Sequence, residues 1–209
     1  KKKKKKKKNY LISKINGKII KAIIIVHVFG RPVNVIRLKR ICKKYNIKII
    51  EDASESLGSF VKFNKKKIHT GLLGDIGCMS FNANKIITTG SGGMILTNKK
   101  SYFNRALYLS TQSKNDSIFF KHNEVGYNYR MDNLSASLGL SQFNKIKQIL
   151  KKKRNDYLLY KKSFSEDKNF EIIGTPDQTI CNNWLNIIKI KKKITKKNFK
   201  KFKDKRIKY

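Results

Sequence analysis

The strongest constraint on the fold of this chain is a pair of short β-branched runs separated by one amphipathic segment. Residues 22–28 (AIIIVHV) and 47–50 (IKII) are almost continuously apolar, which is typical of strands buried on both faces of a parallel sheet. Between them, residues 33–45 place apolar side chains at near-helical spacing. This order predicts a β-α-β unit and therefore an α/β protein with a mostly parallel sheet flanked by helices.

The pattern continues along the chain and then changes near residue 170. We expect further strands over 76–81 and 92–97, and helices over 99–110 and 132–162. After these, short apolar runs at 170–173 and 184–190 and a Lys-rich helical stretch from residue 195 resemble the start of a small α+β unit.

The expected domain organisation has three parts. Residues 1–21 form a basic, disordered segment, because the run Lys1–Lys8 repels itself and cannot pack. Residues 22–150 form a partial large domain that binds the ligand. Residues 151–209 form a linking helix and a partial C-terminal small domain.

The net charge of the chain is strongly positive. The sequence has 50 Lys plus Arg against 13 Asp plus Glu, a formal net charge of +37, which ordinarily indicates nucleic acid or an anionic membrane. Lys far exceeds Arg, however, and no cluster combines Arg with aromatic base readers. We therefore expect solvated surface lysines and neither a specific nucleic-acid partner nor a membrane. A basic nucleic-acid or membrane-surface binding protein is the alternative.

Cysteine and histidine usage favours a cytoplasmic protein without a metal site. The three cysteines are odd in number, widely separated and without a Cys-x-x-Cys pair, so they support neither a disulfide framework nor a zinc site. The three histidines are equally scattered. The basic start followed by an apolar run imitates a secretory signal, but lysines interrupt it and no small-residue cleavage site follows.

Two acidic residues directly follow the second predicted strand. Glu51 and Asp52 then lie at the carboxyl end of a parallel strand, where open α/β sheets place their ligands. Capping of a following helix requires the same residue type at the position of Asp52, so the pattern alone leaves both readings open.

Several motifs together carry a more specific signal. They occur in the chain order EDASESLGS from residue 51, GDIG from residue 74, SFNANK from residue 80, TTGSGGM from residue 88 and HNEVGYNYRM from residue 122. In this order they resemble the DegT/DnrJ/StrS nucleotide-sugar aminotransferases, over about residues 22 to 190. The same segments look like the branch that makes 4-amino sugars for legionaminic-type nonulosonic acids.

The resemblance implies a fold type I transferase that uses pyridoxal 5'-phosphate, and it assigns a role to five residues. Lys85, in the SFxxxK pattern, matches the lysine that holds the cofactor as an imine and then acts as general acid and base. Asp52 matches the carboxylate that faces the pyridine nitrogen, and Glu55 matches a position near the phenolic oxygen or the lysine. Ser80 matches a phosphate ligand, and Asn128 matches an asparagine that reaches the phosphate of the neighbouring subunit's cofactor.

Each of these residues also has an ordinary reading. In so Lys-rich a chain, Lys85 alone would be a solvated side chain. Ser80 would be a buried serine at a strand end, and Asn128 an ordinary loop residue. The glycine cluster at 90–93 lacks P-loop and Rossmann spacing and is read as a tight turn before a strand.

The implied activity is transfer of an amino group from glutamate to the 4-keto carbon of a nucleotide-linked deoxysugar, in surface polysaccharide or nonulosonic acid biosynthesis. It implies a nucleotide-sugar substrate, an amino-acid donor and a homodimer with shared active sites. A sugar dehydratase is an alternative within the same fold, but that subgroup typically has His at the position of Lys85.

One part of the family pattern has no counterpart in this sequence. Nothing before Ala22 resembles the N-terminal portion that cradles the cofactor phosphate and stacks on its ring. We therefore expect apolar sheet surface to be exposed and the isolated chain to be poorly soluble or oligomeric and catalytically silent. An inactive or split-gene fragment of the enzyme is the corresponding alternative.

Overall fold

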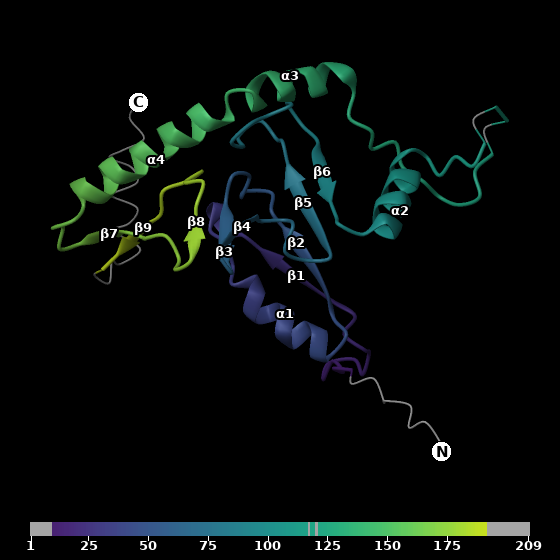
Figure 1. The fold of residues 1–209 in the computed structure, drawn as a ribbon, viewed down its shortest axis with the longest axis horizontal. Helices are drawn as coiled ribbons and strands as arrows, with labels where there is room; N and C mark the ends of the chain where they lie inside the picture. The colour runs from purple at the N-terminus through teal and green to yellow at the C-terminus, as the bar shows by residue number, and fades with distance from the viewer. Residues whose placement is uncertain (1–9, 117, 120, 192–209) are drawn as a thin grey trace, which may run out of the picture.

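The sheet that the sequence predicts is present in the computed structural model, which describes residues 10–116, 118–119 and 121–191 (Figure 1). Its strands, in spatial order, are β1 (Ala22–Val26), β2 (Lys48–Asp52), β5 (Ile76–Ser80) and β6 (Gly93–Leu96). The first three are parallel, and β6 pairs with β5 in the antiparallel sense. The expected mostly parallel α/β sheet is confirmed.

Helix α1 (Val35–Lys44) completes the predicted β-α-β unit between β1 and β2. The Asn34 side chain caps its N-terminus by accepting a hydrogen bond from the backbone N–H of Arg37 at 3.1 Å. The helix buries Val35 and Cys42 in one cluster with residues of β1 and β2. This cluster is the core on one face of the sheet.

Burial of β1 on both faces, which its apolar run predicts, is wrong for the described residues. Successive side chains of a strand point to opposite faces, so Ile25 reaches the core while its neighbours face the other way. Ile24 and Val26 are 66% and 43% exposed. Helix α1 covers the face of Ile25, whereas Ile24 and Val26 on the other face are exposed and no described element covers them, as expected for exposed apolar sheet surface.

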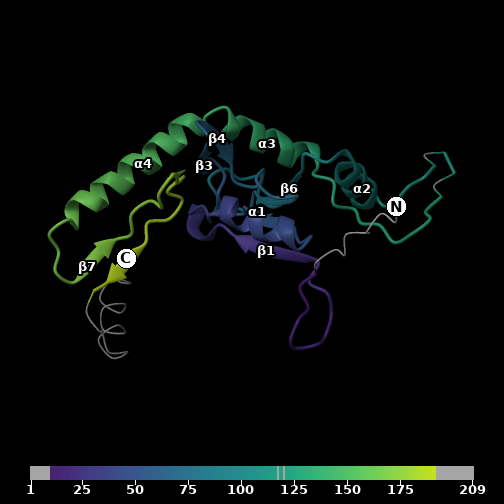
Figure 2. The same ribbon diagram turned by 60° about the horizontal axis from the view of Figure 1, so that its bottom comes forward.

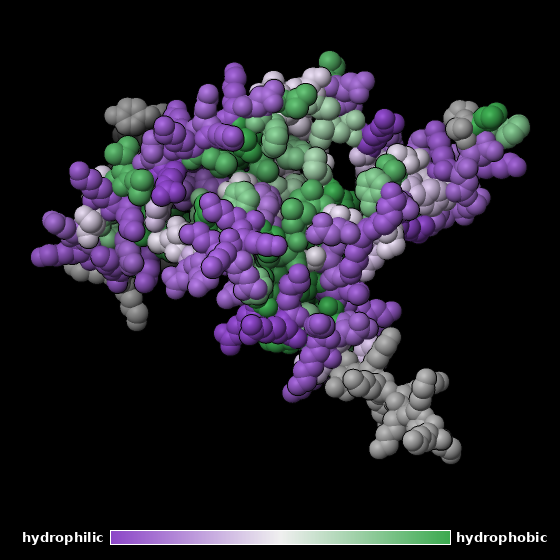
Figure 3. Space-filling model, in the orientation of Figure 1, coloured by the Kyte–Doolittle hydropathy of each residue, from purple (hydrophilic) through white to green (hydrophobic). Residues whose placement is uncertain are grey.

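Hydrophobic surface is also visible in the space-filling view. Figure 3 shows it in the middle of the molecule, where Figure 1 draws β5, β6 and α3, with hydrophilic side chains around it. Exposed apolar side chains of this region include Met94 and Ile95 of β6 and Leu140 of α3.

A buried carboxylate fastens the loop after β4 to the sheet. The Glu51 side chain accepts hydrogen bonds from His27 Nε2 at 2.9 Å, from the backbone N–H of Gly71 at 2.9 Å and from that of Gly74. His27 Nδ1 accepts from Val33 N–H at 3.1 Å, so its proton is on Nε2. Burial alone would raise the pKa of Glu51, but these hydrogen bonds outweigh it and lower the pKa. Glu51 is therefore a charged, fully paired group in the core.

The remaining helices are α2 (Lys100–Ser110), α3 (Asn133–Phe143) and α4 (Ile146–Ser163). The single helix expected over 132–162 is wrong, because the chain breaks at Asn144 and Lys145. The Gln142 side chain bonds to the backbone N–H and C=O of Thr88 and fixes the end of α3. From there α4 takes its own direction, and the two helices follow one another across the top of the molecule (Figures 1 and 2).

Two small sheets complete the described fold. One contains β3 (Phe60–Phe63), β4 (Lys66–His69) and β8 (Thr179–Ile180), and the other contains β7 (Phe170–Ile172) and β9 (Ile188–Ile190). The sequence pattern does not predict β3, β4 or β8, and it begins β9 four residues early. None of the described helices is both long and apolar enough to cross a bilayer.

Two expectations remain open after the structure. The domain boundary expected at 150/151 falls inside α4 and stays a prediction. The disordered run Lys1–Lys8 and the helical stretch from residue 195 lie outside the described residues.

The buried carboxylate makes a testable prediction about stability. Glu51→Gln replaces an acceptor-only group with an amide whose NH2 faces backbone donors, so we expect a loss of about 1–3 kcal/mol in the free energy of unfolding, measured with urea. The lowered pKa adds a pH dependence. Glu51 stabilises the fold above its usual pKa of 4.5, and this contribution is lost as pH falls toward the folded-state pKa.

The matched control is Glu166→Gln, which makes the same chemical change at an exposed position. It should leave both the stability at neutral pH and its acid dependence unchanged. If Glu51→Gln keeps the wild-type loss of stability below pH 4.5, the pairing of Glu51 is not its source.

Candidate functional site

The carboxyl ends of two neighbouring parallel strands place Asp52 and Ser80 on one face of the sheet. Asp52 is the last residue of β2 and Ser80 the last of β5. Asp52 lies opposite Cys78 in the register, and Ser80 follows Cys78 by two positions, so the three side chains share a face. This is the open face that carries Ile24 and Val26. The sheet edge expected to hold the ligand therefore presents a carboxylate, a thiol and a hydroxyl.

Asp52 does not cap a helix, so that reading of the residue is wrong. Turns rather than a helix follow β2, and the Asp52 carboxylate accepts a hydrogen bond from the backbone N–H of Ser54 at 3.1 Å. The negative charge also affects its neighbour on β5. Burial raises the pKa of the Cys78 thiol, and the charge of Asp52 raises it further.

Lys85 lies in the connection between β5 and β6 and is not a solvated lysine. Its side chain is only 14% exposed. The backbone N–H donates to the carbonyl of Asn82 at 3.0 Å in a turn that directs the side chain toward the loop after β2. There its Nζ lies 3.8 Å from Glu55 Oε1 and 4.4 Å from the centroid of the Trp184 ring.

Glu55 is held from two sides. Its Oε1 faces Lys85, and its Oε2 accepts a hydrogen bond from the backbone N–H of Phe29 at 2.6 Å. Phe29 has φ of +56°, a left-handed conformation that is uncommon for a bulky residue. The structure thus joins the loop after β1, the loop after β2 and the loop after β5 at one carboxylate.

Ser80 lies at the start of the Lys85 loop. Its Oγ accepts a hydrogen bond from the backbone N–H of Asn82 at 3.3 Å. The side chain is partly exposed, so Ser80 is not a fully buried serine at a strand end.

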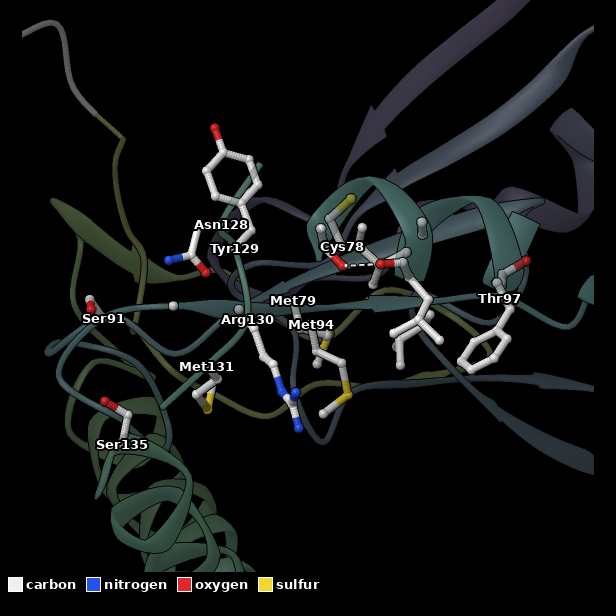
Figure 4. Close-up of a pocket in the computed structure, with 18 of the residues that line it drawn as sticks. Cys78, Met79, Ser91, Met94, Thr97, Asn128, Tyr129, Arg130, Met131 and Ser135 are labelled. Atoms are coloured by element: carbon white, nitrogen blue, oxygen red, sulfur yellow. Dashed lines mark hydrogen bonds between the residues drawn. The ribbon is translucent and has the colours of Figure 1, made fainter. Parts of the chain in front are cut away.

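Asn128 lines a cavity that the other four residues do not line. It is on the wall of a cavity of about 840 Å³ between the end of β5, β6, α2 and the segment before α3 (Figure 4). Figure 4 shows Asn128 on the same side as Ser91, with Tyr129 and Arg130 following it along the chain. Asp52, Glu55, Ser80 and Lys85 are not among the residues lining this cavity.

The glycine cluster forms part of the same wall. Gly90 and Gly92 have φ of +83° and +94°, and β6 begins at Gly93. The reading as a tight turn before a strand is confirmed.

The sequence motifs do not include two residues that contact the loops of Lys85 and Glu55. Trp184 and Asn182 follow α4, and they contact the loops of Lys85 and Glu55 from a segment 100 or more positions away in the sequence. The one available signal is that Trp184 is the only tryptophan in the chain.

Comparison with known proteins adds a family match. Residues 7–208 match the profile of the DegT/DnrJ/EryC1/StrS aminotransferase family. EpsN of Bacillus subtilis, described as a putative pyridoxal phosphate-dependent aminotransferase, is 32% identical over 83% of this chain and 44% of its own length. GDP-perosamine synthase of Escherichia coli O157:H7 is 38% identical over 74% of this chain and 42% of its own. The chain thus spans less than half the length of these curated relatives.

Solved structures agree with the family match. PseC of Helicobacter pylori, an aminotransferase involved in the biosynthesis of pseudoaminic acid, superposes with a TM-score of 0.75 at 28% identity, covering 88% of this chain and 48% of its own. An E. coli GDP-4-keto-6-deoxy-D-mannose-3-dehydratase with bound hydrated pyridoxal phosphate gives 0.70 at 26% identity, covering 82% and 47%. The expected α/β fold of type I is confirmed.

The two contacts of Glu55 are separable by substitution. Glu55→Gln keeps an oxygen for Phe29 N–H and removes only the charge that faces Lys85, so we expect a loss below about 1 kcal/mol in unfolding free energy. Glu55→Ala removes the acceptor as well and should cost about 0.5–1.5 kcal/mol more. Urea unfolding of both variants measures the difference. Equal losses would contradict a role for the Phe29 hydrogen bond.

Proposed function

This chain belongs to the DegT/DnrJ/EryC1/StrS aminotransferase family, and from that premise we propose that it carries the reactive lysine of a pyridoxal-phosphate-dependent sugar aminotransferase. The proposed reaction moves an amino group, from glutamate, to the 4-keto carbon of a nucleotide-linked deoxysugar.

The observation that carries the proposal is the placement of the Lys85 amine. Its Nζ is 3.8 Å from the Glu55 carboxylate, and both side chains are largely enclosed, at 14% and 25% exposure. The loop that carries it begins at Ser80 on the same edge of the sheet as Asp52. An amine that condenses with an aldehyde, a carboxylate that accepts from a protonated pyridine nitrogen and a hydroxyl that donates to a phosphate are the groups the cofactor requires, so the residues present fit it.

Lys85 would move the proton during amino transfer, and Glu55 would hold the Lys85 amine in place. Bound pyridoxal phosphate supplies an aldehyde that exchanges amines and a ring that withdraws electrons from the adjacent carbon. Lys85 would be the covalent attachment point and, when free, the base and acid that moves the proton at the reacting carbon. Glu55 would hold the free amine in reach, because its carboxylate already faces Nζ.

Asp52 would keep the ring nitrogen protonated. A carboxylate beside the nitrogen favours the charged form and so strengthens electron withdrawal. The hydrogen bond from Ser54 N–H fixes the orientation of the Asp52 side chain for this purpose. The Ser80 hydroxyl would bind the phosphate.

Asn128 would contribute to a second site rather than to this one. Asn128 lines a cavity that Lys85 does not line, which fits a residue that reaches the cofactor phosphate of a neighbouring subunit. A homodimer with shared sites is therefore part of the proposal.

The substrate class follows from the relatives, not from the geometry. They are named as GDP-perosamine synthases and as UDP-4-amino-4,6-dideoxy-N-acetyl-beta-L-altrosamine transaminases. These names support a nucleotide-sugar substrate and a role in surface polysaccharide or nonulosonic acid biosynthesis, with the legionaminic-type branch as the finer proposal. Lys85 favours amino transfer over the dehydratase alternative. The free thiols of Cys42, Cys78 and Cys181 support a cytoplasmic location.

Covalent labelling tests the assignment of Lys85. Incubation with pyridoxal phosphate, borohydride reduction and peptide mapping should place most of the label on Lys85, because its amine is enclosed and paired with a carboxylate at the proposed site. Lys85→Ala should lose that label. Lys48, whose Nζ lies 3.9 Å from Asp75 on the surface, provides the matched control, and Lys48→Ala should leave the labelling unchanged. Label spread evenly over the surface lysines would overturn the proposal.

Substitution of Asp52 tests the ring-nitrogen partner. Asp52→Asn keeps an oxygen for Ser54 N–H and removes the charge, so stability should change little. The affinity for pyridoxal phosphate, measured by absorbance titration, should fall on the order of tenfold to a hundredfold, which is typical for loss of a charge-assisted hydrogen bond. Unchanged affinity would show that Asp52 does not face the ring.

A further inference from the structure

The segment that follows α4 reaches back to the candidate site. Residues 182–184 lie about 100 positions after Lys85 in the sequence, yet they contact the loops that carry Glu55 and Lys85. None of the motifs includes this segment.

Trp184 is fixed in orientation by two hydrogen bonds. Its ring Nε1 donates to the carbonyl of Asn84 at 2.7 Å, and its backbone N–H donates to Asn182 Oδ1 at 3.0 Å. The side chain is only 8% exposed and packs in a cluster with Ile86 and Ile87. Packing in this cluster, together with the bond to Asn84, holds the ring face toward Lys85.

Asn182 ties the same segment to the loop of Glu55. Its Nδ2 donates to the carbonyls of Glu55 at 2.8 Å and Leu57 at 2.9 Å, and its backbone N–H donates to Ser59 Oγ at 3.0 Å. Asn182 therefore fixes the loop of Glu55, and Trp184 fixes the loop of Lys85. The distance between the carboxylate and the amine depends on this bridge.

We propose that Trp184 is a positioning residue for the Lys85 amine. The ring face attracts the ammonium, with Nζ 4.4 Å from the ring centroid, but it is not a hydrogen-bond acceptor of the usual kind. The amine is thus located by the ring while its N–H donors remain free for Glu55. The attraction acts on the charged nitrogen, so Trp184 holds the Lys85 ammonium beside Glu55 while no cofactor is attached to it.

The relevance of this contact to amino transfer rests on the proposed function, whereas the contact itself is testable without it. Reductive methylation with formaldehyde and cyanoborohydride modifies any accessible amine and needs no cofactor. Wild-type Lys85 should be protected relative to the exposed lysines of the same molecule. Trp184→Leu should raise its relative methylation about fivefold to tenfold, and Trp184→Phe, which keeps a ring face, should stay within about twofold of wild type.

Pyridoxal phosphate labelling then separates the two proposals. Formaldehyde needs only an accessible amine, whereas selective labelling by pyridoxal phosphate needs the amine to be held at the proposed cofactor site. Trp184→Leu should therefore reduce the share of reduced label on Lys85, and Trp184→Phe should keep it. If the wild type shows no selective labelling but the methylation pattern holds, the proposed function fails and the positioning role stands. Leu185→Ala, a change at an exposed neighbour in the same segment, is the matched control and should alter neither reagent's pattern.

Two results would overturn the inference. One is unchanged methylation of Lys85 in folded Trp184→Leu. The other is a Trp184→Phe variant that behaves like Trp184→Leu, since a purely structural role would require the indole and not a ring face. If Trp184→Leu does not fold, fluorescence decides, because Trp184 is the only tryptophan. Lys85→Met should then change the emission intensity of Trp184, and an unchanged emission refutes the contact.

Discussion

The buried carboxylate of Glu51 organises the part of the fold that carries the candidate site. It accepts a hydrogen bond from His27, the residue directly after β1, and two more from backbone amides of the loop before β5. A buried charge is tolerable only when it is fully paired, so these three partners must keep their places together. Asp52 is the next residue along β2, and the turn that leads to Glu55 begins immediately after it. The position of the reactive groups thus follows from a charge that does not itself face the ligand.

Local patterns predicted the elements that depend on neighbours in sequence. The apolar runs located β1 and β2, the near-helical spacing located α1, and the acidic pair located the edge at which Asp52 lies. The same patterns did not predict which faces of a strand are buried or where a helix changes direction. A run such as AIIIVHV looks alike whether one or both faces are covered, and apolar spacing continues through Asn144 and Lys145, where the helix ends.

In the candidate site, too, the sequence motifs predicted some residues and not others. Asp52 and Ser80 come from motifs at strand ends, and they lie at one edge of the sheet, while Lys85 lies in the loop that begins at Ser80. Glu55 is expected near the phenolic oxygen of the cofactor or near the lysine, and its carboxylate lies 3.8 Å from Lys85 Nζ. The contact of Trp184 with Lys85 was not predictable, because it depends on the direction that α4 takes after its break. Asn128 stays a prediction, since a residue that serves a neighbouring subunit leaves no trace within one chain.

The open face of the sheet has a thermodynamic consequence. Asp52, Cys78 and Ser80 project from the same side as the exposed Ile24 and Val26. A chain segment or second molecule that covers those apolar side chains and extends to the carboxyl ends of the strands would also cover the edge where a ligand would lie. Covering the sheet and binding the ligand are then linked equilibria. The cover raises the affinity for the ligand, and the ligand raises the affinity for the cover by the same factor. A ligand at this edge would act as an assembly factor for the protein as well as a participant in its chemistry.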